Sequence, residues 1–182
     1  MAALYITKSQ ARDTSKHSTE WNESLSTLWI AASNGYAPVV RALIDRGADI
    51  DKATDDGVTP LCMASQEGHV EVVRVLLEQG ADIDKAADNG ATPLCIASER
   101  GHVEVVRVLL EQGADVDKAS NNGATPLIIA SQEGHVEVVS VLVDQGADID
   151  KASQGQTPLQ IARQMNHTEI VHLLELLSLI HI

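Results

Sequence analysis

Apolar residues follow one another along this chain in short helical stripes, and a glycine closes each stripe. In one representative stretch, apolar side chains dominate residues 61–64 and recur through 70–79, while Gly68 and Gly80 end the two stripes. Spacings of three and four residues place side chains on one face of a helix, whereas a strand would alternate. Glycine readily takes the left-handed conformation in which helices end. The pattern predicts a first helix of about two turns that ends at Gly68, and a second helix over about 70–79.

A threonine and a proline mark the start of the first helix. Thr59 can accept a backbone N–H bond as the N-cap, and Pro60, which has no N–H and a preset φ, suits the first helical position. The same Thr-Pro-Leu triplet recurs in steps of 33, 33 and 32 residues, at 59–61, 92–94, 125–127 and 157–159. A period of this size predicts one small unit that is stacked on copies of itself.

Tight-turn signals separate the predicted helix pairs. Asp-Gly and Asn-Gly dipeptides stand at 56–57, 89–90 and 122–123, and such dipeptides favour hairpin turns. Helices this short are marginal alone, so they persist only where neighbouring units cover their apolar faces, and fewer than about three units should not fold. The predicted fold class is an all-α repeat solenoid, in which stacked helix-turn-helix units are joined by β-hairpin-like loops.

The repeat divides the chain into five units. Aligned on the residue that follows the first helix, they carry Gly35, Gly68, Gly101, Gly134 and Asn166. The first and last units are degenerate, which suits caps that face water on one side. The predicted boundaries are 1–20 for a flexible polar leader, 21–176 for the array, and 21–53, 54–86, 87–119, 120–152 and 153–176 for its units.

Two interpretations of the last six residues stay open. The string at 177–182 matches one translated frame of the common transposase adapter of sequencing libraries. In that case these residues are adapter-derived and are kept out of fold reasoning, and the natural C-terminus is missing. The other interpretation is the end of an amphipathic helix.

The motifs of one unit occur in an order that resembles the ankyrin repeat. In the third unit they are Gly90-Ala91-Thr92-Pro93-Leu94, Ala97, Gly101-His102, Val105-Val106, Leu109-Leu110 and Gly113-Ala114-Asp115. The resemblance covers about residues 22–176. It implies the solenoid predicted above and a non-catalytic scaffold that binds another protein.

One position departs from the family pattern. The family motif Thr-Pro-Leu-His-x-Ala places a histidine where the five units carry Trp29, Cys62, Cys95, Ile128 and Gln160. The resemblance therefore does not carry over the hydrogen bonds that this histidine makes between repeats.

The net charge of −13 resides in the repeats, because Lys8, Arg12 and Lys16 outweigh Asp13 and Glu20 near the start. An acidic array repels phosphate backbones and anionic lipid, so neither nucleic acid nor membrane is expected as a partner.

Neither end of the chain has the pattern of a secretory signal peptide or of a membrane-spanning helix. Residues 1–6 are too short for a secretory core, and the apolar run at 173–182 is interrupted and too short to span a bilayer. Cys62 and Cys95 occupy the same place in adjacent units, about 8–10 Å apart in a stack and beyond disulfide reach. The expected location is intracellular, either cytoplasmic or nuclear, with both thiols free and buried.

Asp-x-Asp pairs and single histidines recur along the chain, and both residue types can bind metal ions. A calcium site needs about six to eight converging oxygens, and the sequence has no EF-hand loop or calcium-binding nonapeptide. The histidines occur once per unit, without a second ligand at metal spacing, and in the family they pack in the turn. The residues concerned are Asp49, Asp51, Asp82, Asp84, Asp115, Asp117, Asp148 and Asp150, and His69, His102 and His135. We interpret them as solvated loop acids and turn histidines.

Motifs for catalysis are missing from the sequence. It contains no nucleophile elbow, phosphate-cradling loop or metalloprotease motif, and it implies no apolar pocket that would separate the pKa values of its acids. We therefore predict that this chain has no catalytic residue and binds neither a metal ion nor a cofactor. An alternative from another class is a regulatory or targeting segment of a larger, truncated multidomain enzyme, and a third is a spacer without a specific partner.

In the ankyrin family the hairpin tips and the concave side of the first helix commonly face the partner. The resemblance assigns this role to Asp55, Asp56, Val58, Gln66, Glu67, Asp88, Asn89, Ala91, Glu99, Arg100, Asn121, Asn122, Ala124, Gln132 and Glu133. Units two and three differ at seven places, four of them on this face, although drift at exposed positions would explain that equally. This face has six acids and one cation, Arg100, which favours a basic or polar partner protein. The chain is expected to bind this partner as a monomer.

The four aromatic residues, Tyr5, Trp21, Trp29 and Tyr36, all lie near the start of the chain. They suit either a cap on the exposed end of the stack or an anchor for a partner. The cap is the favoured interpretation.

Overall fold

The computed structural model describes residues 27–180, in which ten helices follow one another. They are α1 (Thr27–Ser33), α2 (Ala37–Asp45), α3 (Pro60–Glu67), α4 (Val70–Glu78), α5 (Pro93–Arg100), α6 (Val103–Glu111), α7 (Pro126–Glu133), α8 (Val136–Asp144), α9 (Pro158–Gln164) and α10 (Thr168–Ile180). The predicted leader, residues 1–20, lies outside the described residues, as do 21–26 and 181–182.

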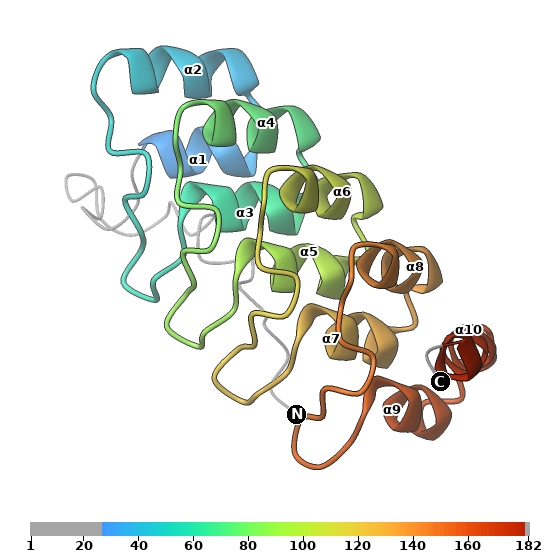
Figure 1. Cartoon of the computed structure of the whole chain (residues 1–182). Helices are drawn as coiled ribbons and strands as arrows, with labels where there is room; N and C mark the ends of the chain where they lie inside the picture. Colours follow the sequence, from blue (N-terminus) through green and yellow to red (C-terminus); the bar gives the residue numbers. More distant parts are fainter. Residues whose placement is uncertain (1–26, 181–182) are drawn as a thin grey trace, which may run out of the picture.

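The helices form two layers, each running the length of the array (Figure 1). Odd-numbered helices pack side by side from α1 to α9 and make the inner layer, and even-numbered helices do the same from α2 to α10 and make the outer layer. Each inner helix also packs against the outer helix that follows it. The predicted all-α repeat solenoid is confirmed.

Local signals set the helix ends as predicted. Thr59 Oγ1 accepts the Cys62 N–H bond at 3.1 Å, and Pro60 occupies the first turn of α3. Gly68 ends α3 with a φ of 76°, and Asn166 takes the same left-handed conformation in the last unit with a φ of 61°. The outer helix after Gly68 ends at Glu78, one residue before the expected position.

The turns between units are hairpin-like, although strand pairing is limited to one bridge, Ser153 to Gln156, in the described part of the chain. In the first turn the Gly57 N–H donates to Thr54 O at 2.9 Å, and the Thr54 N–H donates to Val58 O at 3.0 Å. These bonds close the loop directly before the next inner helix and project its tip from the array.

A continuous apolar core lies between the two layers. It contains a fully buried leucine from each of α3, α5 and α7, namely Leu61, Leu94 and Leu127, and at the last unit it ends in Ile170 and Leu174 of α10. No unit has a core of its own, so each pair of helices depends on its neighbours for burial.

Candidate functional site

Six polar residues form a row of exposed hairpin tips, which we define as residues 55–56, 88–89 and 121–122. Adjacent tips are joined through the backbone, because the Asp88 N–H donates to Asp56 O at 3.1 Å and the Asn121 N–H donates to Asn89 O at 3.0 Å. The Asn121 side chain adds a bond from Nδ2 to Asp88 O at 2.8 Å. The tips are therefore held at fixed spacing along one edge of the array.

Asparagine side chains also hold the turns internally. Asn89 Oδ1 accepts the Ala91 N–H bond and Asn122 Oδ1 accepts the Ala124 N–H bond, each at 2.9 Å. Such bonds stabilise a turn locally, and they fix the conformation in which the tip is presented. Two of the polar tip side chains, Asn89 and Asn122, thus bond to the backbone of their own turns.

The inner helices present one further stripe beside the tips. In α3 the residues Met63, Gln66 and Glu67 share one helical face, whereas Leu61 and Ala64 point into the core. The inner-helix stripe consists of these residues and their equivalents, namely Met63, Gln66, Glu67, Ile96, Glu99, Arg100, Ile129, Gln132 and Glu133.

Four of the predicted contact residues are buried, so little of their side chains is open to a partner. Val58, Ala91 and Ala124 are 2%, 0% and 9% exposed, and Gln66 is 8% exposed. Val58 and Ala91 belong to a small apolar cluster with the two cysteines, so their side chains stabilise the hairpin base. The eleven that retain exposure are Asp55, Asp56, Glu67, Asp88, Asn89, Glu99, Arg100, Asn121, Asn122, Gln132 and Glu133.

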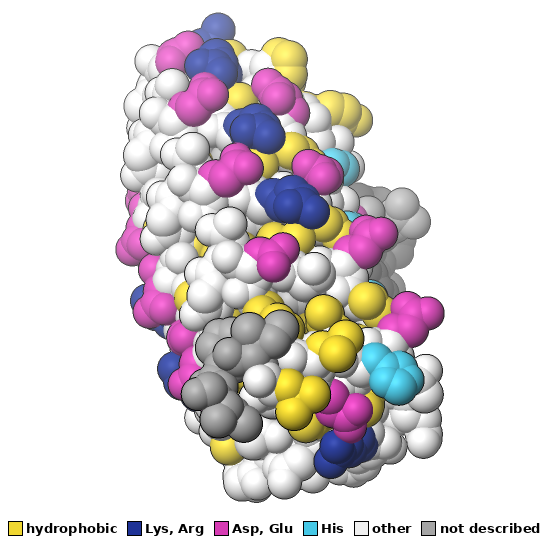
Figure 2. Space-filling view, turned by 45° about the vertical axis from the view of Figure 1, so that its right-hand side comes forward, with side chains coloured by type: hydrophobic (Ala, Val, Ile, Leu, Met, Phe, Trp, Pro, Cys, Tyr) yellow, Lys and Arg dark blue, Asp and Glu magenta, His cyan; other side chains and the backbone are white. Residues whose placement is uncertain are grey.

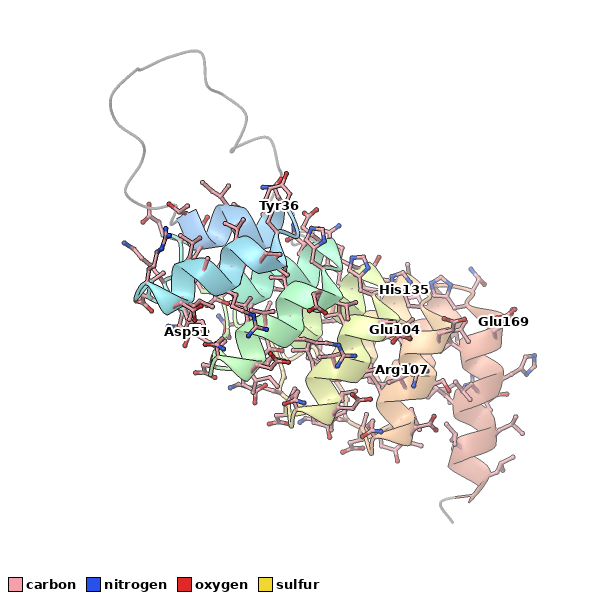
Figure 3. All side chains as sticks on the ribbon, turned by 90° about the horizontal axis from the view of Figure 1, so that it is seen from above. Tyr36, Asp51, Glu104, Arg107, His135 and Glu169 are labelled. Carbon is pink, nitrogen blue, oxygen red and sulfur yellow. The ribbon has the colours of Figure 1, made fainter. Side chains whose placement is uncertain are left out.

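The charge of this face differs from that of the outer helices. Around the tips and the inner-helix stripe, Asp55, Asp56, Glu67, Asp88, Glu99 and Glu133 accompany a single cation, Arg100. On the outer helices, basic and acidic side chains alternate down the array (Figure 2). There Arg41 pairs with Glu78 at 3.1 Å across a repeat junction, and Arg107 approaches Glu104 at 3.7 Å within α6 (Figure 3).

The histidines link each unit to the one before it. His69, His102 and His135 contact a carbonyl oxygen of the preceding inner helix through Nε2, at 3.1, 3.0 and 2.9 Å. A carbonyl only accepts, so Nε2 carries the hydrogen. Each ring lies so close to a preceding glycine that a Cβ on Gly68 would approach His102 at 2.8 Å. The prediction that these histidines pack in the turn is confirmed.

A fourth histidine joins this row and was missed from the sequence. His167 Nε2 contacts Gln132 O at 3.0 Å. Its neighbour Asn166 stands where the other units have glycine, which obscured the Gly-His pair. The signal was its position, because His167 follows Asn166 as His135 follows Gly134.

The Asp-x-Asp steps bind backbone groups of the next unit. The Asp82 N–H donates to the Asp51 carboxylate at 3.2 and 3.3 Å, and the Lys85 ammonium donates to Asp51 O at 3.1 Å. Equivalent bonds join Asp84 to Asp115 and Asp117 to Asp148. These acids are therefore structural as well as solvated, and within residues 27–180 no group of three or more potential ligands is gathered for a metal ion.

Both cysteines are free and buried, as predicted. The Cys62 and Cys95 thiols donate to Lys85 O at 3.6 Å and to Lys118 O at 3.5 Å. Burial raises the pKa of both thiols, so they stay protonated and unreactive. At this position, where the family pattern has histidine, the thiol reaches the loop that ends its own unit and leads into the next one.

The N-terminal aromatic residues fall partly within the described chain. Trp29 is 7% exposed in α1, and Tyr36 is 58% exposed before α2. Tyr5 and Trp21 lie outside the described residues. Among helices α1 to α10, none is both long enough and apolar enough to cross a bilayer.

A protein-family model described as ankyrin repeats in three copies matches this chain in overlapping stretches. The matched residues are 5–87, 28–120, 81–153 and 116–177. A search of curated proteins found no match.

Proposed function

Because the chain belongs to the ankyrin repeat family, whose members are protein–protein interaction modules, we propose that it is a non-catalytic scaffold. It binds a partner protein through the hairpin tips and the concave face, which is the face of the inner helices. The observation that supports this proposal is the row of exposed tips, whose polar side chains are held by bonds such as Asn121 Nδ2 to Asp88 O.

The mechanism is recognition by a preformed surface. Each tip is fixed to its neighbour through the backbone, so little conformational entropy is lost when a partner binds. Affinity then depends on the match of shape and charge across several shallow contacts. Two residues of this face, Asp88 and Asn121, occupy the same place in adjacent units, so units three and four contribute different contacts there.

The charge of the face supports a basic or polar partner. The face carries six carboxylates and one cation, Arg100, and the tip acids Asp55, Asp56 and Asp88 are exposed. Opposite charges attract over about 10 Å at moderate salt, so lysine or arginine side chains on the partner would speed association and fix its orientation. Binding should weaken as the salt concentration rises.

The test is affinity purification with mass spectrometry from the native source, with two matched baits beside the wild-type chain. The tip variant carries Asp55→Asn, Asp56→Asn, Asp88→Asn and Glu99→Gln, and the control carries Glu71→Gln, Glu111→Gln, Glu137→Gln and Asp144→Asn on the outer helices. Each removes four acids. We expect a partner that the wild-type and control baits retain and the tip variant loses. Equal retention by all three baits would contradict the proposal.

We also propose that the chain acts as a monomer in the cytoplasm or nucleus. The two free, buried cysteines are consistent with a reducing compartment. Light scattering of the purified chain and cell fractionation would test the two parts separately.

A further inference from the structure

Two of the hairpin tips carry an asparagine directly before a glycine. The pairs are 89–90 and 122–123, and both asparagines are exposed; the second pair lies in the loop that projects between α6 and α7 (Figure 1). Asparagine is a chemically labile residue, because the backbone nitrogen of the next residue can attack its side-chain carboxamide. Glycine has no Cβ to obstruct that approach. The array therefore presents the same reactive pair twice, in turns whose bonds differ.

The carboxamide of Asn122 is bound by two donors. The Ala124 N–H donates to Asn122 Oδ1 at 2.9 Å, and since a backbone N–H only donates, the atom that faces it is the oxygen. The Ser120 hydroxyl lies 2.7 Å from the same oxygen and 3.1 Å from Ala124 O, so its shorter bond goes to Asn122. Attack on the carboxamide carbon places negative charge on this oxygen, and donors already aimed at it stabilise that charge.

Asn89, the equivalent residue of unit three, lacks one of these donors. Among the described residues, Asn89 Oδ1 accepts a bond from the Ala91 N–H alone, at 2.9 Å. Ala87 stands where unit four has Ser120, and alanine has no hydroxyl. Attack on the Asn89 carboxamide is therefore stabilised less by the turn.

One bond slows the reaction equally at both tips. The Gly123 N–H donates to Ser120 O and the Gly90 N–H donates to Ala87 O, each at 2.8 Å. The glycine nitrogen is thus engaged in the turn, and its peptide must rotate before it attacks the asparagine. This bond is the same at both places, so it does not separate them.

The carbonyl of the rotating peptide is held differently at the two tips. Asn89 O accepts the Asn121 N–H at 3.0 Å, a bond that joins the backbones of units three and four. Asn122 O accepts instead the Ser153 hydroxyl at 3.0 Å. A hydroxyl turns about its own bond and follows a moving acceptor, whereas a backbone N–H does not. Rotation of the peptide therefore costs less at Asn122.

We propose that Asn122-Gly123 is a site of spontaneous deamidation, favoured by the fold over Asn89-Gly90. The Gly123 nitrogen forms a bond to Cγ of Asn122 and gives up its proton through water. The Cγ–Nδ2 bond breaks, and the side-chain nitrogen leaves with that proton as ammonia, so that a cyclic imide remains. A water molecule then opens the imide to aspartate or to isoaspartate.

The reaction changes the charge of the tip. Unit two shows that aspartate fits this turn, because Asp56 O accepts the Asp88 N–H at 3.1 Å. Conversion of Asn122 would add a seventh acid to the six of the face, and isoaspartate would also lengthen the backbone of the tip by one carbon. The consequence for partner binding rests on the proposed function, whereas the reaction itself does not.

The test follows both sites in the purified full chain, with no partner present. The chain is incubated in mildly alkaline buffer and digested with trypsin, which cleaves after Lys85 and Lys118 and places the two asparagines on separate peptides for mass spectrometry. We expect Asn122 to be converted about three- to tenfold faster than Asn89, the effect of one hydrogen bond made in the transition state. In urea, where the turns are lost, the two rates should become equal.

Two exchanged variants assign the difference to the hydroxyl. Ser120→Ala should slow the conversion of Asn122 about threefold or more and leave Asn89 unchanged, and Ala87→Ser should accelerate Asn89 by about the same factor. Equal rates in the folded wild-type chain, faster conversion of Asn89, the same preference in urea, or no effect of Ser120→Ala would overturn the inference. Each of these outcomes leaves the proposed function untouched, because no partner enters the measurement.

Discussion

Replacing Gly90 by alanine should destabilise the array more than the same replacement of Gly113. The two glycines have φ values of 80° and 91°, so a Cβ costs about 1–2 kcal/mol of backbone strain at either place. At Gly113 the Cβ would meet nothing within 4 Å, but at Gly90 it would lie 2.5 Å from the backbone nitrogen of Asn121. That nitrogen donates to Asn89 O across the repeat junction and cannot rotate away as a side chain could.

Relief of the contact at Gly90 requires adjacent hairpins to move apart, and overpacking of this kind costs about 1–3 kcal/mol. We therefore expect Gly113→Ala to lower the free energy of unfolding by about 1–2 kcal/mol and Gly90→Ala by about 2–5 kcal/mol. Urea denaturation followed by circular dichroism measures both, and the difference isolates the junction because both variants carry the backbone strain. Equal losses would refute the close approach of neighbouring hairpins.

Three further predictions test the packing of the repeats. Ser98→Ala should raise the free energy of unfolding by about 1 kcal/mol in thermal denaturation, because the Ser98 hydroxyl is buried without a hydrogen-bond partner; a loss of stability would contradict this. His102→Ala should lower it by about 1–3 kcal/mol, through loss of the bond to Gln66 O, while His172→Ala, at an exposed position, should change it little. Burial raises the pKa of Cys62 and Cys95, so the unfolded state ionises first and stability falls as pH rises through about 8.5. Thiol labelling at that pH should be slow in the folded chain and complete in denaturant; fast labelling without denaturant would contradict the burial.

The helices could be predicted because their ends are determined by short-range chemistry. Thr59 caps a helix that begins with the adjacent proline, and Gly68 ends it, so both signals act within a few residues. The period then repeats the same local solution along the chain. This is why the helix pairs agree with the sequence to within a residue at Glu78.

The burial of the candidate face could not be predicted in the same way. Val58 was assigned to the face by its place in the repeat, yet it is 2% exposed, because Cys62 and the cluster of the next unit enclose it. Burial depends on which side chains of neighbouring units meet, and a single unit contains no such information. The bond from Asp82 to Asp51 was missed for the same reason, since it joins residues of different units.

Three sets of polar bonds run along the array and use backbone groups, histidines and loop aspartates, while the Asn121 side chain adds one further bond between adjacent tips. The histidines bind carbonyls of the preceding inner helix, the aspartates of the loops bind amides of the next unit, and the tips are joined through their backbones. Each set repeats at every junction between the central units. These bonds therefore join the units whichever residue occupies an exposed tip. Exchange of Asp88 for the residue of another unit would then alter charge and shape at one contact without loosening its neighbours. The bonds that join the units are thus largely independent of the exposed tip residues. This is the physical reason why a stack of nearly identical units can recognise a specific partner.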